Sequence, residues 1–416
     1  MKVLACHNYY QQRGGEDECF EGEVQLLRSR GVEVSTFTRH NDDIRQMSRW
    51  KVSVGTIWSK DSYSQLRAVI RQQQPDVVHF TNTFPLISPA AYAAARSERV
   101  PIVQALHNYR LMCPSAVLFR SGRICEDCVG KFVPWPGVLH KCYRGSLSGS
   151  AVVGGMLAWH RLMRTWRRNV DLFYTQTEFA RRKLIEGGIR EDRIVAKPNF
   201  IDPDPGLGGG QGRYAVFVGR LDATKGVQTL LDAWTRYDAP IPLNIIGDGP
   251  MGERVAAVAG EGHRIRRLGR LPLDQVLSTI GDALLLVMPS IWYETFGRTV
   301  MEAYAKGTPV VASRLGAMSE IVQHGTTGLT FEPGNPAELA ACVRRLAQDA
   351  AAVAEMRRAA RRAYEEKYMA ECNFQLLMGI YRRAIERRAD RSDMAARQTA
   401  GDRADSGRTR NGETAP

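Results

Sequence analysis

The sequence lacks any apolar run long enough to cross a bilayer. Its longest candidate, residues 151–159, has nine residues and includes two glycines, whereas a spanning helix needs about 20 apolar residues. The apolar stretch before His7 is also too short for a signal peptide. We therefore expect a cytoplasmic protein.

A disulfide framework is lacking as well. The 416 residues include only eight cysteines, and half of them form one cluster: Cys113, Cys125, Cys128 and Cys142. In a large intracellular chain such a cluster indicates metal or thiol chemistry rather than disulfides. Four thiolates would form a closed, structural zinc or iron site with no open position for catalysis. The alternatives are reduced thiols that pack a loop, or a disulfide formed under oxidation.

Acidic residues are scarce relative to basic ones. The chain has 57 Lys and Arg against 44 Asp and Glu, a net charge of +13. This excess is typical of proteins that bind nucleic acid, anionic membranes or phosphorylated ligands. The sequence contains no recognisable nucleic-acid-binding motif, and its basic residues are spread along the chain. A basic nucleic-acid-binding protein therefore stays as an alternative of a different class.

The remaining composition is that of an ordinary globular protein with two to three domains. Apolar strands alternate with helices twice along the chain, which predicts two doubly wound α/β domains with parallel sheets. We divide the chain into an N-terminal Rossmann-like domain with the Cys-rich insertion (1–198), a Gly- and Pro-rich linker (199–213), a second Rossmann-like domain with closing helices (214–388) and a disordered tail (389–416). Ligands bind such sheets at the carboxyl ends of their strands, so we expect a cleft between the domains.

Two glycine-containing loops follow strands of the second domain. In the loop 218–226, Arg220 and Lys225 lie just beyond a strand, where two cations could neutralise a diphosphate. The second loop, IIGDGPMG, contains the G-x-G-x-x-G pattern of dinucleotide-binding enzymes. That match is incomplete, because Pro250 stiffens the loop and the strand is not the first of its domain. A dehydrogenase is therefore the other alternative.

A third loop, PSIWYETFGRTVMEAYAKG, combines two carboxylates with a helix start. Glu294 lies in the loop, the helix begins near Phe296 and Gly297, and Glu302 follows on the helix. The free N–H groups of a helix N-terminus bind anions. A sugar and a ribose on either side of a diphosphate would each need a carboxylate to accept hydrogen bonds from their hydroxyl groups. This spacing therefore favours a nucleotide sugar as the ligand.

Together with the following strand, GTPVVAS, these loops resemble the retaining nucleotide-sugar glycosyltransferases of family 4 (group 1) over residues 1–388. The resemblance implies the GT-B architecture, in which two Rossmann-like domains face each other across a cleft. It also implies roles for individual residues: Arg220 and Lys225 on the donor pyrophosphate, Glu294 towards the donor sugar, the backbone N–H groups of Phe296 and Gly297 near sugar or phosphate, Glu302 on the ribose, and residues 267–270 along the base.

The resemblance extends to the first domain. There the glycine-rich loop with Gly15 would close on the donor, and His107, at the end of a strand, would hydrogen-bond a hydroxyl of the donor sugar. His79 also ends a strand and could line the acceptor side. The family usually needs no divalent ion, so we expect no catalytic metal, and we discount Asp202 and Asp204 because they lie among prolines in the linker.

Residues 154–169 read as a basic amphipathic helix. Its apolar stripe contains Met156, Trp159, Leu162, Met163 and Trp166, and the segment contains no acidic residue. Such a helix either packs its stripe into its own domain or lies on an anionic bilayer. Enzymes of this family commonly act in surface-polysaccharide or lipid-linked glycan assembly. We therefore expect a glycan or lipid-linked acceptor, no nucleic acid, and peripheral contact with the inner face of the membrane.

Overall fold

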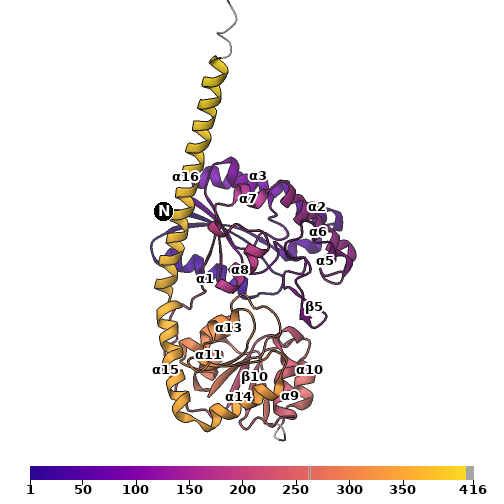
Figure 1. Ribbon diagram of the computed structural model, residues 1–416, viewed down its shortest axis with the longest axis vertical. Coiled ribbons are helices and arrows are strands. Elements are labelled where there is room, and N and C mark those ends of the chain that lie inside the picture. The colour runs from indigo at the N-terminus through magenta and orange to yellow at the C-terminus, as the bar shows by residue number, and fades with distance from the viewer. Residues whose placement is uncertain (261, 263, 409–416) are drawn as a thin grey trace, which may run out of the picture.

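Each of the two strand–helix alternations forms its own parallel sheet. The computed structural model describes residues 1–260, 262 and 264–408, with side chains described through residue 391. Two α/β domains lie end to end, and the last helix, α16 (Ala370–Arg408), runs along one side of the N-terminal domain (Figure 1). The expected doubly wound architecture is confirmed in both domains.

The N-terminal sheet has the strand order β2-β1-β3-β4-β7-β8, and all its pairings are parallel. Its central strands are buried along their whole length, which explains their continuous apolar sequences. The strands are β1 (Lys2–Tyr9), β2 (Glu33–His40), β3 (Val77–Phe80), β4 (Ile102–Ala105), β7 (Leu172–Thr175) and β8 (Ile194–Ala196), and the Cys-rich insertion adds a hairpin of β5 (Phe119–Arg120) and β6 (Arg123–Ile124).

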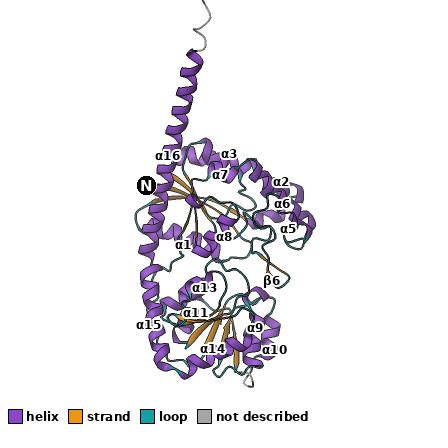
Figure 2. Cartoon of the chain, viewed as in Figure 1, coloured by secondary structure: helices purple, strands orange, loops and turns teal. Residues whose placement is uncertain are grey.

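Helices cover both faces of this sheet (Figure 2). They are α1 (Gly15–Ser29), α2 (Arg49–Ile57), α3 (Lys60–Gln73), α4 (Ala90–Ser97), α5 (Trp135–Leu139), α6 (Leu147–Leu162), α7 (Thr165–Asn169) and α8 (Glu178–Glu186). The single basic helix expected over residues 154–169 is wrong, because Arg164 adopts a left-handed conformation with φ of 53° and separates α6 from α7.

The C-terminal sheet repeats the design with the order β11-β10-β9-β12-β13-β14, again all parallel. Its strands are β9 (Ala215–Val218), β10 (Leu243–Ile246), β11 (Ile265–Gly269), β12 (Leu285–Met288), β13 (Val310–Ser313) and β14 (Gly328–Phe331). Its helices are α9 (Val227–Thr235), α10 (Gly252–Val258), α11 (Leu273–Asp282), α12 (Arg298–Ala305), α13 (Ala317–Ile321), α14 (Pro336–Gln348) and α15 (Ala350–Lys367).

The segment between the sheets, residues 199–213, lies against the second domain rather than hanging free. The backbone N–H groups of Gly208, Gly210 and Gly212 donate to carbonyl oxygens of that domain at 2.8–3.0 Å. A Cβ atom on Gly208 would lie 2.2 Å from the carbonyl oxygen of Gly281. Close backbone packing therefore requires glycine in this segment, a constraint that the sequence, read as a Gly- and Pro-rich linker, did not indicate.

The last helix, α16 (Ala370–Arg408), returns to the N-terminal domain. Leu377, Ile380 and Tyr381 pack into the same buried cluster as residues of β1, β3, β4 and β7. The sequence division assigned residues 370–388 to the second domain, but their apolar face completes the first one. The chain also stays helical beyond residue 389, where a disordered tail was expected, and Arg391 donates a hydrogen bond to Asp171. Residues 409–416 of that predicted tail lie outside the described residues.

No helix within the described part of the chain is both long enough and apolar enough to span a membrane.

A buried ion pair joins the elements that meet between sheet and α16. The Nζ atom of Lys197, at the end of β8, lies 2.7 Å from Glu23 of α1 and donates to Asn373 of α16 at 2.9 Å. The Glu23 carboxylate also accepts a hydrogen bond from Tyr174. Burial by itself would raise the pKa of Glu23, but the charge and hydrogen bond of Lys197, together with His79 and His107, lower that pKa to about 2. The pair is therefore charged in the folded protein.

We predict that Lys197→Met destabilises the N-terminal domain by about 3–5 kcal/mol, because it leaves Glu23 buried without its counter-charge. Combining it with Glu23→Gln should recover part of the loss. The measurement is urea unfolding of both variants, with Lys60→Met on the surface of α3 as the matched control. Equal stability of Lys197→Met and wild type would show that the N-terminal domain does not depend on the ion pair between Lys197 and Glu23.

Candidate active site

The topological switch points of the two sheets supply most of the predicted site residues. In the second domain the strand order reverses between β9 and β12. Lys225 follows β9 and Glu294 follows β12. Ligands of open α/β sheets bind at such crevices. The sheet topology therefore places the two predicted loops side by side without any reference to their chemistry.

A glycine fixes how closely these two loops approach. Gly226 has φ of 70°, and a Cβ atom there would lie 1.7 Å from the carbonyl oxygen of Pro289. The backbone N–H of Ile291 donates to the carbonyl oxygen of Thr224 at 2.9 Å. Any side chain at position 226 would push the loops apart. Gly226 therefore holds Lys225 beside Glu294.

Glu294 is the centre of a hydrogen-bond network. Its Oε1 atom accepts from Lys225 Nζ at 2.6 Å, from Ser290 Oγ at 2.7 Å and from Trp292 Nε1 at 2.8 Å. The residue is only 6% exposed. In the ligand-free protein the carboxylate is therefore oriented by three donors, and Lys225 serves as its counter-ion.

Arg220 lies beside this network but is more open to solvent. Its guanidinium is 3.4 Å from Asp222, and the side chain is 63% exposed. Residues 267–270 were predicted to lie along the base, and Arg267 and Arg270 are exposed, on the edge strand β11 and just beyond it. These cations remain accessible at the carboxyl edge of the sheet.

The helix α12 begins directly after the Glu294 loop. Gly297 caps it with φ of 84°, and a Cβ atom at this position would lie 2.5 Å from Met318. Glu302, on the buried side of α12, lies 3.3 Å from Arg298. Burial raises the pKa of Glu302, and Arg298 opposes that effect. Arg298 also forms an ion pair with Glu18 of α1, so this carboxylate is linked to the other domain.

The Glu294 loop contacts the first domain directly. Thr295 Oγ1 donates to the carbonyl oxygen of His107 at 3.1 Å, and Thr177 donates to the carbonyl oxygen of Thr295 at 3.2 Å. Glu320 of the second domain accepts from the first two backbone N–H groups of α8, those of Glu178 and Phe179. No local pattern in the sequence indicates these contacts, because they join residues that are far apart along the chain and meet only in the fold.

His107 lies two residues beyond the end of β4 of the first domain, at the junction with this loop. Its Nε2 atom is buried and has no hydrogen-bond partner among the described residues. Burial lowers the pKa of His107 to about 4, although Glu23 acts in the opposite direction. The imidazole is therefore neutral at pH 7, and one ring nitrogen remains available for a ligand.

The loop after β1 faces the same edge. Gly14 caps α1, and a Cβ atom on Gly14 or Gly15 would meet no atom within 4 Å. The side chains of Glu16 and Arg110 line a small cavity of about 50 Å³ together with His107. Thr81 also lines it, and its buried hydroxyl has no partner among the described residues. Open space and unpartnered polar atoms thus meet on the N-terminal side of the junction.

Two other residues, His79 and Asp204, were considered in the sequence and lie away from this junction. His79 is buried, with Nε2 at 3.1 Å from the Tyr174 hydroxyl and Nδ1 at 2.9 Å from the Tyr381 hydroxyl. Both ring nitrogens are therefore used inside the fold, and the suggestion that His79 lines the acceptor side is wrong. Asp204 is held by Arg361 at 2.5 Å, which agrees with setting it aside as a metal ligand.

The G-x-G-x-x-G pattern has a structural cause. A Cβ atom on Gly247 would lie 1.9 Å from the carbonyl oxygen of Gly219, and one on Gly249 would lie 2.7 Å from that of Leu221. The backbone N–H of Leu221 in turn donates to the carbonyl oxygen of Asp248 at 2.9 Å. These glycines allow the loop after β10 to pack against the loop that carries Arg220.

The four clustered cysteines come together in space. Cys113, Cys125, Cys128 and Cys142 line one cavity of about 10 Å³ in the insertion, and all eight cysteines of the chain are free. Burial raises the pKa of Cys128 to about 11. Within the described residues, no group of three or more His, Cys, Asp or Glu side chains is arranged as a metal site. Structural zinc therefore stays a prediction.

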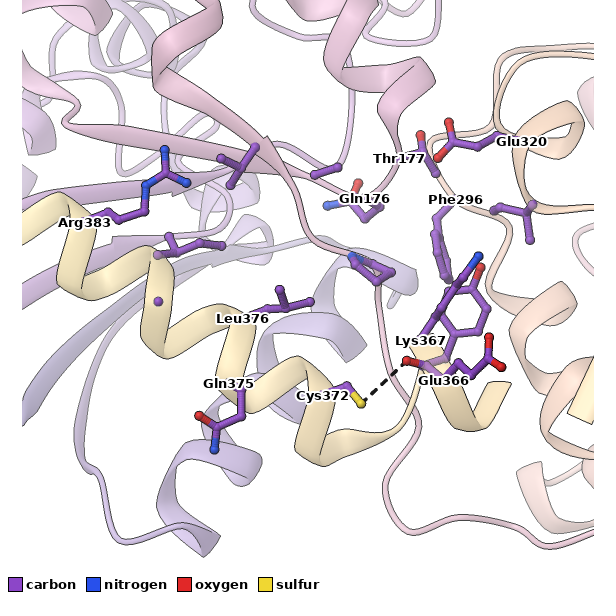
Figure 3. Close-up of a pocket in the computed structure, with 17 residues that line it drawn as sticks. Gln176, Thr177, Phe296, Glu320, Glu366, Lys367, Cys372, Gln375, Leu376 and Arg383 are labelled. Carbon is purple, nitrogen blue, oxygen red and sulfur yellow. Dashed lines mark hydrogen bonds between the residues drawn. The ribbon is translucent and has the colours of Figure 1, made fainter. Parts of the chain in front are cut away.

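A larger cavity of about 790 Å³ lies on the α16 side of the domain junction (Figure 3). Phe296 and Thr177 form one wall, and Leu376 of α16 lines the opposite side. The Phe296 ring packs against Tyr368 at 5.7 Å between centroids. This cavity is lined by neither Lys225 nor Glu294, so Phe296 separates it from their network.

Family models match both domains of the chain. Residues 212–349 match the model described as glycosyl transferases group 1, and residues 14–199 match that of a glycosyl transferase 4-like domain. The expected resemblance to the glycosyltransferases is thereby confirmed in both halves. Membership of family 4 and retention of configuration stay predictions.

Curated relatives match parts of the chain. A glycogen synthase from Mycobacterium tuberculosis is 37% identical over 153 residues, which are 35% of this chain and 36% of the relative. A GDP-mannose-dependent alpha-mannosyltransferase from Corynebacterium glutamicum is 26% identical over 267 residues, covering 64% of this chain and 57% of the relative. The chain thus spans from about a third to just over half of these relatives.

Solved structures match nearly the whole fold. The structure of Anabaena HepE in complex with UDP aligns with a TM-score of 0.64 at 18% identity, covering 91% of this chain and 99% of that one. Sucrose-phosphate synthase from Thermosynechococcus elongatus aligns with a TM-score of 0.67 at 16% identity, covering 92% and 98%. The expected GT-B architecture is confirmed.

The low pKa of His107 has a measurable consequence. Between pH 6.5 and 4 the unfolded chain binds a proton on this histidine that the folded chain does not, so lowering the pH should destabilise the fold. His79, whose pKa burial also lowers to about 4, acts in the same direction. We expect the free energy of unfolding to fall by a few kcal/mol over this range. Ring-carbon NMR titration should show both histidines neutral at pH 6, and titration near 6.5 would contradict the prediction.

The cysteine cluster is tested by metal analysis. Because burial raises the pKa values of the Cys125, Cys128 and Cys142 thiols, a bound metal has to displace protons, and its affinity should fall at acidic pH. We expect about one zinc or iron per chain in reduced protein purified without chelators. Cys125→Ser combined with Cys128→Ser should remove it, whereas Cys342→Ser combined with Cys372→Ser should not. Metal-free wild-type protein would show that the thiols only pack the insertion.

Proposed function

We propose that this chain, which matches a glycosyl transferase model in each of its domains, transfers a sugar from a nucleotide-diphosphate sugar to an acceptor hydroxyl. The reaction takes place at the junction between the domains. The observation that carries the proposal is the hydrogen bond from Thr295 to His107. It brings the Glu294 and Lys225 network of one domain next to the unpartnered imidazole of the other.

The second domain holds the donor. Arg220 and Lys225 bind its diphosphate, and the N-terminus of α12 adds the positive end of a helix dipole. Glu294 accepts hydrogen bonds from hydroxyl groups of the donor sugar, and Glu302 accepts hydrogen bonds from those of the ribose. Lys225 pairs with Glu294 in the free protein. Donor binding therefore redistributes this pair, with the ammonium turning to phosphate and the carboxylate to sugar.

The first domain closes on the donor sugar. Neutral His107 exchanges a hydrogen bond with a sugar hydroxyl through Nε2, and the backbone around Gly15 approaches the phosphates. These groups orient the sugar and stabilise the charge that develops on the leaving diphosphate. On this account His107 positions the sugar and is not the main base.

The finer features of the reaction rest on the motif resemblance. The sugar is a hexose transferred with retention of configuration, by a front-face route in which the diphosphate leaves before the acceptor oxygen has bonded fully. The protein's own cations neutralise the negative charge on the leaving diphosphate, so no catalytic metal is required. The acceptor is a glycan or a lipid-linked glycan in the assembly of a surface polysaccharide, at the inner face of the membrane.

The two alternatives have less support. The glycines that suggested a dehydrogenase are needed for the contact between two loops. The positive charge suggested a nucleic-acid-binding protein, but both domains match glycosyl transferases.

Replacing Glu294 by Gln should lower the transfer rate at least about hundredfold, a loss typical for one oriented polar group at a reacting centre. The donor is first selected by thermal shift with UDP-sugars, GDP-sugars, NAD and an oligonucleotide, because a ligand of the folded state raises the melting temperature. Glu253→Gln, an exposed carboxylate on α10, is the matched control. Stabilisation by NAD or the oligonucleotide alone would refute the function, and NMR of the product's anomeric proton tests retention.

A further inference from the structure

Large apolar side chains are exposed together on the outer face of α2, α5 and α6. We call this the tryptophan face and define it by Trp50 and Trp58 of α2, Phe132 and Trp135 at the start of α5, and Trp159 and Leu162 of α6. Trp50 is 78% exposed, and Leu162 is 62% exposed. Monomeric proteins rarely leave such a patch uncovered unless it binds a partner.

The three segments lie next to one another in the fold. Helix α6 packs against both α2 and α5, and Figure 1 shows all three at one edge of the N-terminal domain. Arg161 of α6 donates to the carbonyl oxygens of Lys131 and Phe132, which ties the loop before α5 to α6. A groove of about 560 Å³, lined by Trp58, Trp159 and Met163, opens between α2 and α6.

The charge around this face is of one sign. The sequence has no Asp or Glu between Asp43 and Asp61, or between Asp127 and Asp171, while these two segments contain eleven Lys and Arg. Lys51, Arg164 and Arg168 are exposed within them. Four of the chain's seven tryptophans also lie in the face itself. Tryptophan beside lysine and arginine is the composition of protein segments at a membrane–water boundary.

We propose that the tryptophan face lies on an anionic lipid bilayer. Its apolar side chains insert between the acyl chains, and its cations contact the phosphate groups of the lipids. This differs from the contact expected for a single basic helix. Arg161 is occupied by backbone carbonyl oxygens, so the contact comes from three segments that are far apart in the sequence.

The position of the face fits a membrane-borne acceptor, and this step rests on the proposed function. Phe84 and Tyr143 pack against the small core beneath α6. The Arg110 guanidinium lies over both rings, at 4.5 Å and 5.4 Å from their centroids. Arg110 and Phe84 also line the cavity next to His107. A chain of contacts through Phe84 and Arg110 therefore links the small core beneath α6 to the cavity next to His107.

Co-sedimentation with vesicles tests the proposal. The full chain should bind vesicles of phosphatidylcholine mixed with phosphatidylglycerol and should bind pure phosphatidylcholine much less. Binding should weaken with added salt, because the Debye length is about 8 Å at physiological ionic strength. A variant combining Trp50→Ser, Trp135→Ser and Leu162→Ser should lower the partition coefficient at least about tenfold, as should Lys51→Glu combined with Arg168→Glu.

Matched controls lie on the second domain. Leu273→Ser and the pair Arg358→Glu and Arg362→Glu replace exposed residues of the same kinds and should leave binding unchanged. Wild-type binding by the face variants, or no binding of the wild type to anionic vesicles, would overturn the proposal. So would a dimer in sedimentation velocity that the apolar variant dissociates, since a second copy would then cover the face. Hydrolysis of the donor in solution should be the same in all variants, so its loss in the wild type would point to the proposed function instead.

Discussion

The chain crosses between the domains twice, and one buried residue, Lys197, links the two crossings. Lys197 lies where the chain leaves the N-terminal sheet, and it donates to Asn373, which lies where the chain returns as α16. Asn373 in turn donates to the carbonyl oxygen of Pro198 at 2.5 Å. Because Lys197 is almost fully buried, its charge requires Glu23 of α1 as a partner. The position of α1, and with it the glycine loop before it, therefore depends on the same lysine that joins the two crossings.

The junction between the domains combines an aromatic contact, Phe179 against Tyr293 with 4.8 Å between ring centroids, with several polar contacts. Thr295 reaches the backbone of His107, Arg298 reaches Glu18, and Glu320 caps α8. Such contacts exchange readily with water and can separate at modest cost in free energy. Lys197 and Asn373, by contrast, are almost fully buried.

The sequence predicted the features that depend on local pattern. Alternating strands and helices gave both sheets, and loops placed after the right strands gave Lys225, Glu294 and Gly297. The errors involve distant residues. Nothing local distinguishes His79, buried between two tyrosines, from His107, whose ring nitrogen is unpartnered. Likewise, the sequence does not reveal that Gly208 of the linker lies so close to the backbone of Gly281 that a Cβ atom would not fit.

The return of α16 to the first domain has a consequence for synthesis of the protein. Leu377, Ile380 and Tyr381 supply part of the apolar cluster on one face of the N-terminal sheet. When a ribosome has completed the first 200 residues, the part of that face that α16 covers is still exposed, and it stays so while the whole second domain is made. Domains usually fold in order as they emerge. Here the first domain to emerge is the last to be finished, so the nascent chain carries an exposed apolar sheet that chaperones would recognise until α16 arrives.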